Sequence, residues 1–216
     1  MQKEVMDIVL DSKIIAIVRG LSSGHVELAQ ALYAGGIRAI EVTLDQAHPS
    51  EWQNTITAIR DIKSAFGDKM VVGAGTVTSE MLVKLTAEAG GQFIVSPDTN
   101  IAVIHRTKEL GMASFPGAMS PSEIITAHNA GADCVKVFPA GVLGPSYIKA
   151  VHAPLNHINL IAVGGINDTN LSDYLKAGCV GVGCGGNLVN KDWVQNKEFH
   201  RITELAKRYV ENAKQY

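Results

Sequence analysis

Lys136 is the residue whose type and setting most clearly suggest chemistry. It stands inside the apolar run Cys134-Val135-Lys136-Val137-Phe138, whose β-branched residues indicate a strand. Lysine is almost never fully buried without a cause. Burial disfavours the ammonium form, lowers the pKa and leaves a neutral amine that can attack a carbonyl carbon. The alternative is an edge position, where the stem packs and the charged head reaches water. Of the two, we favour the nucleophilic amine.

Glu41 raises the same question in a second apolar run, Ala39-Ile40-Glu41-Val42-Thr43. Strand alternation puts Glu41 on one face with Ala39 and Thr43, and the aliphatic pair on the other. If that pair faces surrounding helices, Glu41 faces the inside of the fold. A carboxylate there can transfer protons or serve as the counter-ion of an inward lysine, and the residues leave both roles open.

Two glycine-rich runs form a third group of candidates. Gly164-Gly165 and Gly185-Gly186 each follow an apolar run near the C-terminus. Glycine leaves the backbone N–H groups open to an anion, although it also serves tight turns. As a pair of consecutive loops, the two runs predict a phosphate site.

The elements that must position these residues alternate along the chain. Apolar runs predict strands at Ile14–Val18, Ala39–Thr43, Met70–Gly73, Gln92–Ser96, Met112–Phe115, Asp133–Val137, Leu160–Val163 and Val180–Gly183. Amphipathic spacing predicts helices at His25–Tyr33, Glu51–Ala65, Ser79–Ala89, Ile101–Leu110, Pro121–Asn129, Tyr147–Val151 and Asn170–Ala177. This alternation predicts one α/β domain over residues 1–216. We expect a (β/α)8 TIM barrel with an extra N-terminal helix (Gln2–Leu10) and a C-terminal helix (Lys197–Gln215). An open doubly wound sheet is the alternative, but no GxGxxG follows the first strand.

A barrel makes a prediction about the site, because its chemistry lies at the carboxyl ends of the strands. Arg19 ends the first predicted strand, Thr76 follows the third and Pro97 follows the fourth. Together with Glu41, Lys136 and the glycine pairs, they define one candidate mouth.

Composition excludes several classes of protein. The chain has 216 residues, 46% of them hydrophobic, and a formal charge of −2 without a basic block, which argues against a nucleic-acid partner. Apolar runs are too short to span a bilayer, and the N-terminus does not resemble a signal peptide, so we expect a cytoplasmic protein without a membrane partner. Three cysteines in no CxxC pattern predict no disulfide framework, and seven scattered histidines predict no metal site.

Several motifs together resemble one family in order and spacing. They are Ile17-Val18-Arg19-Gly20, Glu41-Val42-Thr43-Leu44, Gly73-Ala74-Gly75-Thr76-Val77, Ile94-Val95-Ser96-Pro97, Phe115-Pro116-Gly117-Ala118, Val135-Lys136-Val137-Phe138-Pro139 and Ala162-Val163-Gly164-Gly165-Ile166. The chain thereby resembles the bacterial 2-keto-3-deoxy-6-phosphogluconate (KDPG) and 4-hydroxy-2-oxoglutarate (KHG) aldolases from about Ile14 to Val189.

This resemblance implies a class I aldolase that needs no cofactor and forms a homotrimer. Lys136 is then the Schiff-base lysine and Glu41 the acid–base group. Arg19 and Thr76 match the family's substrate contacts, and Pro97 and Phe138 match walls around the pyruvyl group. Gly164, Gly165, Gly185 and Gly186 match the family's phosphate cradle. The implied products are pyruvate with glyceraldehyde 3-phosphate, or with glyoxylate from hydroxyoxoglutarate.

The chain departs from the family pattern at two positions. Asp45 stands where many KDPG members carry an arginine for the pyruvyl carboxylate, and Gly186 stands where members usually offer a serine hydroxyl to the phosphate. The missing arginine and the run Gly144-Pro145-Ser146-Tyr147-Ile148-Lys149 also resemble the 6-phosphogalactonate aldolase branch. A sugar-phosphate isomerase or epimerase that uses Glu41 and Lys136 only for proton transfer is a further alternative.

Overall fold

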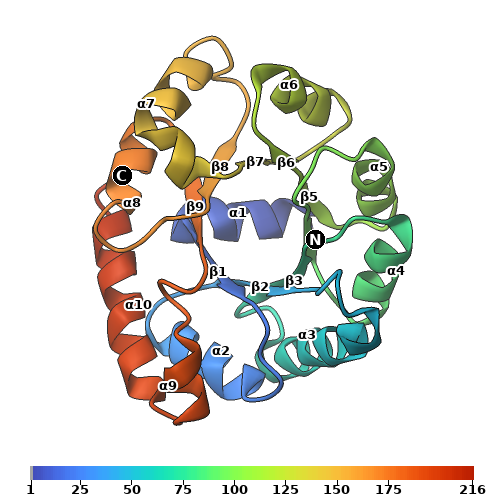
Figure 1. The fold of residues 1–216 in the computed structure, drawn as a ribbon, viewed down its shortest axis with the longest axis vertical. Helices are drawn as coiled ribbons and strands as arrows, with labels where there is room; N and C mark the ends of the chain where they lie inside the picture. The colour runs from blue at the N-terminus through green and yellow to red at the C-terminus, as the bar shows by residue number, and fades with distance from the viewer. Residues whose placement is uncertain (1) are drawn as a thin grey trace.

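A computed structural model describes residues 2–216 and shows parallel strands curled into a barrel inside a ring of helices (Figure 1). The strands are β1 (Ile14–Val18), β2 (Ala39–Thr43), β3 (Val71–Gly75), β4 (Phe93–Val95), β5 (Ala113–Phe115), β6 (Gly117–Ala118), β7 (Val135–Val137), β8 (Leu160–Val163) and β9 (Gly181–Cys184). Their order in the sheet is β5-β4-β3-β2-β1-β9-β8-β7-β6. Only Pro116 separates β5 from β6, which pair with β4 and β7 respectively, so this interrupted strand completes the barrel.

The side chains of each strand alternate between two apolar layers. In β1, Ile15 and Ile17 belong to the cluster inside the barrel, whereas Ile14, Ala16 and Val18 pack in the layer under the helices. Parallel strands that are covered on both faces need apolar residues at nearly every position. This requirement explains the continuous apolar runs of the sequence and makes a charged side chain inside the barrel exceptional.

The helices follow the strands around the outside. They are α2 (His25–Ala34), α3 (Trp52–Phe66), preceded by the 3₁₀ turn η1 (Pro49–Glu51), α4 (Glu80–Glu88), α5 (Ile101–Glu109), α6 (Pro121–Asn129), α7 (Ala140–His152), α8 (Leu171–Lys176), α9 (Lys191–Gln195) and α10 (Phe199–Ala213). Capping side chains mark where two of these helices begin. Ser120 and Glu123 form a capping box at α6, and Asn100 caps α5 through its side-chain oxygen.

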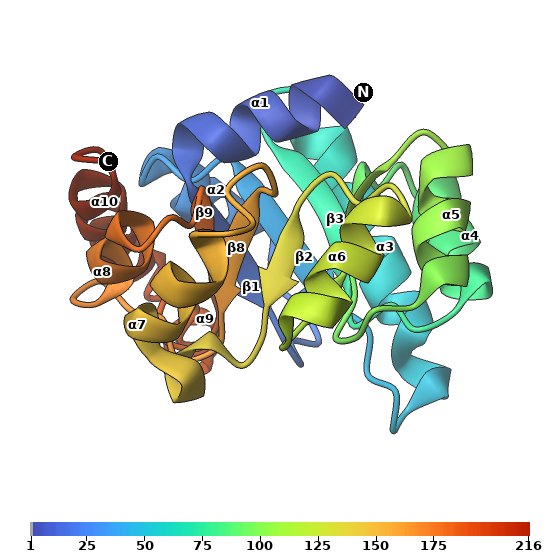
Figure 2. The same ribbon diagram turned by 90° about the horizontal axis from the view of Figure 1, so that it is seen from above.

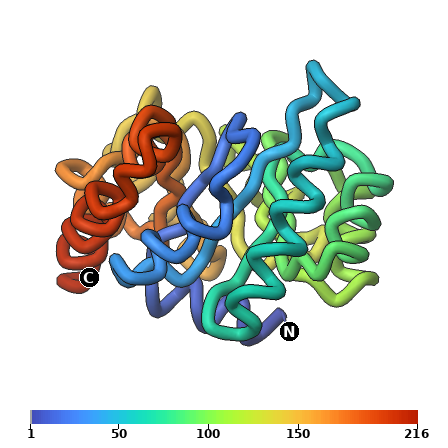
Figure 3. The backbone as a smooth tube through the Cα atoms, turned by 90° about the horizontal axis from the view of Figure 1, so that it is seen from below, coloured from blue at the N-terminus to red at the C-terminus, as the bar shows by residue number. Residues whose placement is uncertain are grey.

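The N-terminal helix closes one end of the barrel. Val5 and Val9 of α1 (Gln2–Ser12) belong to the inner apolar cluster, and Figure 2 shows α1 lying across the end opposite to the strand tips. The carboxyl ends of the strands therefore form the open mouth. Figure 3 shows the chain between β2 and α3 projecting beyond this mouth. The C-terminal helix α10 packs against α2 and α8 at the side.

The structure confirms the predicted α/β barrel and differs from the sequence-based expectation in detail. Helix α7 begins at Ala140 rather than Tyr147, and the non-helical Gly144 (φ 79°) kinks it just before Pro145. The fifth predicted strand, Met112–Phe115, is present as β5, and the unpredicted short strand β6 follows it after Pro116, which has no N–H for the ladder. The short α9 was not predicted, although Asn190 is a typical N-cap residue.

The described part of the chain contains neither a membrane-spanning helix nor a cluster of metal-binding side chains. Within residues 2–216, no helix combines the length and apolar character needed to cross a bilayer. Over the same residues, no group of three or more histidine, cysteine, aspartate or glutamate side chains is arranged to hold a metal ion.

Candidate active site

Glu41 and Lys136 both lie on the inner face of the barrel. In β2 the aliphatic Ile40 and Val42 pack outward while Ala39 belongs to the inner cluster, so alternation turns Glu41 inward. In β7 the same argument applies, because Cys134 is inside and Val135 outside. Glu41 is 4% exposed and Lys136 is 7% exposed. Two buried ionisable groups thus lie inside the barrel next to its inner apolar cluster.

Burial and mutual attraction set the charge states of this pair. Burial lowers the pKa of the Lys136 amine, while the Glu41 carboxylate and, more weakly, Asp98 oppose that shift and Arg19 adds to it. Burial also raises the pKa of Glu41, against the attraction of Lys136 and Arg19. No hydrogen bond joins Glu41 to Lys136 among the contacts of the described residues, so the two charges act through space. The result is an amine closer to its neutral form, with an acid–base group facing it.

Gly75 in β3 leaves the space that the Glu41 carboxylate occupies. Val71 points into the barrel, so Gly73 and Gly75 occupy the next inward positions of the strand. A Cβ at Gly75 would lie 1.7 Å from Glu41 Oε1 and 2.5 Å from its Cδ, and one at Gly73 would lie 2.3 Å from the carbonyl oxygen of Phe93. Any larger residue at Gly75 would therefore displace the carboxylate. Gly75 belongs to the motif Gly73-Ala74-Gly75-Thr76-Val77, but the sequence alone gave no reason to assign it a role.

Arg19 lies at the carboxyl end of β1 and lines two cavities of the mouth. One of about 340 Å³ extends over β2 and β3, and one of about 510 Å³ extends over β8 and β9. Arg19 is exposed, and it exerts a favourable electrostatic effect on the Glu41 carboxylate. An arginine at this junction can bind a carboxylate or a phosphate in either cavity.

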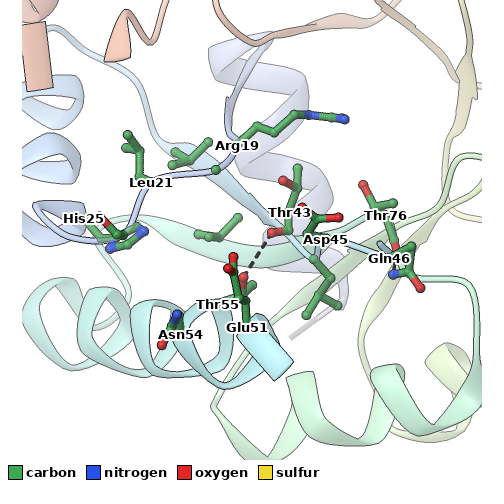
Figure 4. A pocket seen from close by; sticks show the side chains of 15 residues that line it. Arg19, Leu21, His25, Thr43, Asp45, Gln46, Glu51, Asn54, Thr55 and Thr76 are labelled. Atoms are coloured by element: carbon green, nitrogen blue, oxygen red, sulfur yellow. Dashed lines mark hydrogen bonds between the residues drawn. The ribbon is translucent and has the colours of Figure 1, made fainter. Parts of the chain in front are cut away.

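The first cavity contains Thr76 and is lined by both polar and aliphatic side chains (Figure 4). Thr76 adopts a left-handed backbone conformation (φ 59°), which is uncommon for a β-branched residue. The Gln46 amide donates to the carbonyl oxygen of Thr76 at 2.8 Å, and Thr78 Oγ1 donates to Gln46 Oε1 at 3.2 Å. Gln46 therefore ties the loop after β2 to the loop after β3. Sequence reasoning missed it, because nothing local distinguishes this glutamine.

Asp45 also lines the first cavity, but its carboxylate is engaged within its own loop. Asp45 Oδ1 accepts from the Ala47 N–H at 2.9 Å, and Oδ2 lies 3.0 Å from His48 Nδ1. The hydrogen bond to His48 lowers the pKa of Asp45, and the same contact raises the pKa of His48. Both side chains are exposed, so water and salt weaken the pair. Asp45, which stands where the resemblance predicts an arginine, thus makes its side-chain hydrogen bonds inside the loop.

The second cavity is lined by the predicted glycines together with Phe138. Gly164 and Gly165 have positive φ angles of 95° and 79°, and Gly185 and Gly186 follow β9. A Cβ at Gly186 would meet nothing within 4 Å. The ring centroid of Phe138 lies 5.0 Å from Lys136 Nζ, which connects this cavity to the buried amine. The glycines, the aromatic wall and the amine therefore meet at one place.

The structure brings most of the predicted residues together. Arg19 joins Thr76 in one cavity and Phe138 with the glycines in the other, and Glu41 and Lys136 are coupled electrostatically beneath them. Pro97 is exposed after β4 and lines neither cavity. Its carbonyl oxygen approaches Gly117 so closely that a Cβ there would lie 2.4 Å away. Sequence reasoning missed Lys191, which lines the second cavity from α9.

Comparisons with known proteins agree with this geometry. The family described as Aldolase: KDPG and KHG aldolase matches residues 5–205. The chain is 37% identical over 201 residues to the 2-dehydro-3-deoxy-6-phosphogalactonate aldolase of Escherichia coli K12, covering 92% of this chain and 95% of the relative. It is 33% identical over 193 residues to the KHG/KDPG aldolase of the same organism, covering 88% and 86%.

A solved structure extends the match to the fold. The KDPG aldolase of Legionella pneumophila, with pyruvate captured at low pH as a covalent carbinolamine intermediate, superposes with a TM-score of 0.84 at 28% identity, covering 96% of this chain and 97% of the other. The chain therefore belongs to the KDPG and KHG aldolase family and is an aldolase, that is, a carbon–carbon lyase.

Proposed function

We propose that the chain cleaves 2-keto-3-deoxy-6-phosphogluconate to pyruvate and glyceraldehyde 3-phosphate through a Schiff base on Lys136. The observation that carries this proposal is a lysine amine, 7% exposed inside a barrel, whose pKa burial lowers and whose electrostatic partner is the buried Glu41. A neutral amine is the form that attacks a keto carbon. A relative of the same fold was captured with pyruvate as a carbinolamine.

The reaction follows from the positions of the two groups. Lys136 Nζ attacks the C2 keto carbon, and loss of water from the carbinolamine leaves a protonated imine. Glu41 accepts the proton of the C4 hydroxyl, through a water molecule, as the C3–C4 bond breaks. The bonding electrons pass into the imine and form an enamine. Protonation at C3 by Glu41, followed by hydrolysis of the imine, releases pyruvate and restores the amine.

The two cavities suit the two ends of such a substrate. We assign the pyruvyl carboxylate to the side of Arg19 and Thr76, with Phe138 as a wall beside the pyruvyl group, whereas Pro97 lines neither cavity and is not part of this assignment. We assign the phosphate to the open backbone at Gly164, Gly165, Gly185 and Gly186. The same site can take 4-hydroxy-2-oxoglutarate, which has a second carboxylate in place of the phosphorylated arm.

The galactonate epimer is a second candidate substrate, and a specific observation favours it. The relative with 37% identity is named for 2-dehydro-3-deoxy-6-phosphogalactonate, and the match covers 95% of that relative. The ratio of kcat/KM among the gluconate, galactonate and hydroxyoxoglutarate substrates measures the preference directly. A ratio above one for galactonate over gluconate would reassign the substrate and leave the Lys136 chemistry unchanged.

Borohydride trapping tests the Schiff base. Incubation with pyruvate and borohydride should add one reduced pyruvyl group to the peptide that carries Lys136, and Lys136→Ala should abolish it. A lactate-dehydrogenase-coupled assay should report pyruvate release by the unsubstituted protein. Turnover without an adduct would instead support proton-transfer chemistry of the isomerase or epimerase type.

We further propose that residues 1–216 act as one domain, that the chain assembles as a homotrimer and that it works in the cytoplasm. Large apolar side chains are exposed around α6 and α7, among them Val142 (84%), Met119 (53%) and Ile125 (41%), which supports an interface there. Light scattering should give about three times 23.0 kDa, and Val142→Asp should lower that mass.

The cysteines support the proposed cytoplasmic location. Cys134, Cys179 and Cys184 are free and buried, which suits a reducing compartment. Cell fractionation tests this location.

A further inference from the structure

Helix α9 brings into the second cavity a cation that the aldolase proposal does not use. Lys191 is the first residue of α9, and Asn190 caps the helix by accepting from the N–H groups of Asp192 at 2.9 Å and Trp193 at 3.2 Å. Val194 is buried on the inner side of the helix. The backbone that carries Lys191 is therefore held in place by its cap and by packing.

The ammonium group of Lys191 lies beside the end of β1. A Cβ at Gly20 would be 2.9 Å from Lys191 Nζ, and Gly20 directly follows Arg19. Lys191 and Arg19 both line the cavity that contains Gly164, Gly165, Gly185 and Gly186. Two cations from distant parts of the chain thus meet at the cavity that we assign to the phosphate.

Neither cation is neutralised by a direct protein contact. Among the hydrogen bonds and ion pairs of residues 2–216, none joins Lys191 or Arg19 to a carboxylate, although Asp192 also lines the cavity. Because both side chains line the same cavity, an anion bound there is attracted by both positive charges. The open space at Gly186, where no side-chain hydroxyl is present, leaves the anion short of one donor that an ammonium group can replace.

We propose that Lys191 binds the phosphate of the substrate and makes the enzyme selective for phosphorylated aldehydes. The inference rests on the proposed aldolase function and adds a residue to it. Gly164, Gly165, Gly185 and Gly186 supply backbone N–H groups, whereas Lys191 supplies the charge. A charge-assisted hydrogen bond to phosphate is stronger than a neutral one, so Lys191 acts on the phosphorylated substrate and has no partner on an unphosphorylated one.

The test is the selectivity between two aldehydes in condensation with pyruvate. The measured quantity is the kcat/KM for glyceraldehyde 3-phosphate divided by that for glyceraldehyde. Lys191→Ala should lower this ratio about tenfold or more, and Lys191→Arg should retain most of it. The matched control is Lys207→Ala, which removes an exposed lysine of α10.

A second measurement needs no turnover. Calorimetric titration with inorganic phosphate should show weaker binding to Lys191→Ala than to the unsubstituted protein or to the Lys207→Ala control. A selectivity ratio and a phosphate affinity both within twofold of the unsubstituted protein would overturn the role of Lys191. The pyruvate–borohydride adduct of the unsubstituted protein involves no phosphate. Its absence would overturn the aldolase proposal instead, so the two failures are distinguishable.

Discussion

Replacing Gly75 by alanine tests the assignment of Glu41 most directly, because it moves the carboxylate without changing it. The added Cβ would lie 1.7 Å from Glu41 Oε1, 2.5 Å from Cδ and 2.7 Å from Cγ. Ordinary contacts between such atoms are about 3.5 Å, so the carboxylate must retreat by more than about 1 Å. Buried on the inner face of the barrel, Glu41 has little free space in which to do so.

The expected cost to activity follows from this displacement. A misplacement of about 1 Å in a catalytic group can lower the rate on the order of 100-fold, and the whole acid–base contribution is about 10²–10⁴-fold. We therefore expect Gly75→Ala to reduce kcat for pyruvate release by roughly 100-fold in the coupled assay. Overpacking should lower the free energy of unfolding by about 1–3 kcal/mol, which thermal denaturation monitors.

Two comparisons separate this cause from general damage. Lys136 remains in place, so the borohydride-trapped pyruvate adduct should still reach full stoichiometry at long incubation. In the double variant Glu41→Ala/Gly75→Ala the clash is gone, and its kcat should be no lower than that of Glu41→Ala alone. A Gly75→Ala enzyme with kcat within threefold of the unsubstituted protein, or additive losses in the double variant, would refute the reasoning.

Four further predictions concern the two cavities and the amine. The initial rate of pyruvate adduct formation should rise with pH through a midpoint below the ordinary lysine value of 10.5, because burial lowers the pKa of Lys136. Glu41→Gln removes the charge that raises this pKa and should shift the midpoint further down; an upward shift would contradict the coupling. Gly186→Ser places a hydroxyl in open space and should lower KM for glyceraldehyde 3-phosphate roughly three- to tenfold, and an unchanged KM would remove the phosphate from this loop. Gln46→Ala removes the 2.8 Å hydrogen bond to the Thr76 carbonyl and should raise KM for pyruvate severalfold while kcat changes less, whereas an unchanged KM would show that Thr76 needs no such support.

The barrel could be predicted because most of its strands are marked by short apolar runs in the sequence. Runs such as Ile14–Val18 are apolar at every position, as strands that are covered on both faces require. The break at Pro116 and the early start of α7 were not predictable in the same way. A proline that completes a barrel and a glycine that joins two helical segments depend on what lies beside them.

Residue types alone determined that Lys136 and Glu41 would be anomalous, since a charged side chain inside a buried strand conflicts with its surroundings wherever that strand lies. Their family motifs also determined the class of reaction to expect. The sequence could not show that Gly75 leaves the space for Glu41, that Asp45 turns its carboxylate toward His48, or that Lys191 reaches the glycine beside Arg19. These facts depend on distances between segments that closure of the barrel brings together. Local propensity carries no information about such distances, so only the tertiary structure decided them.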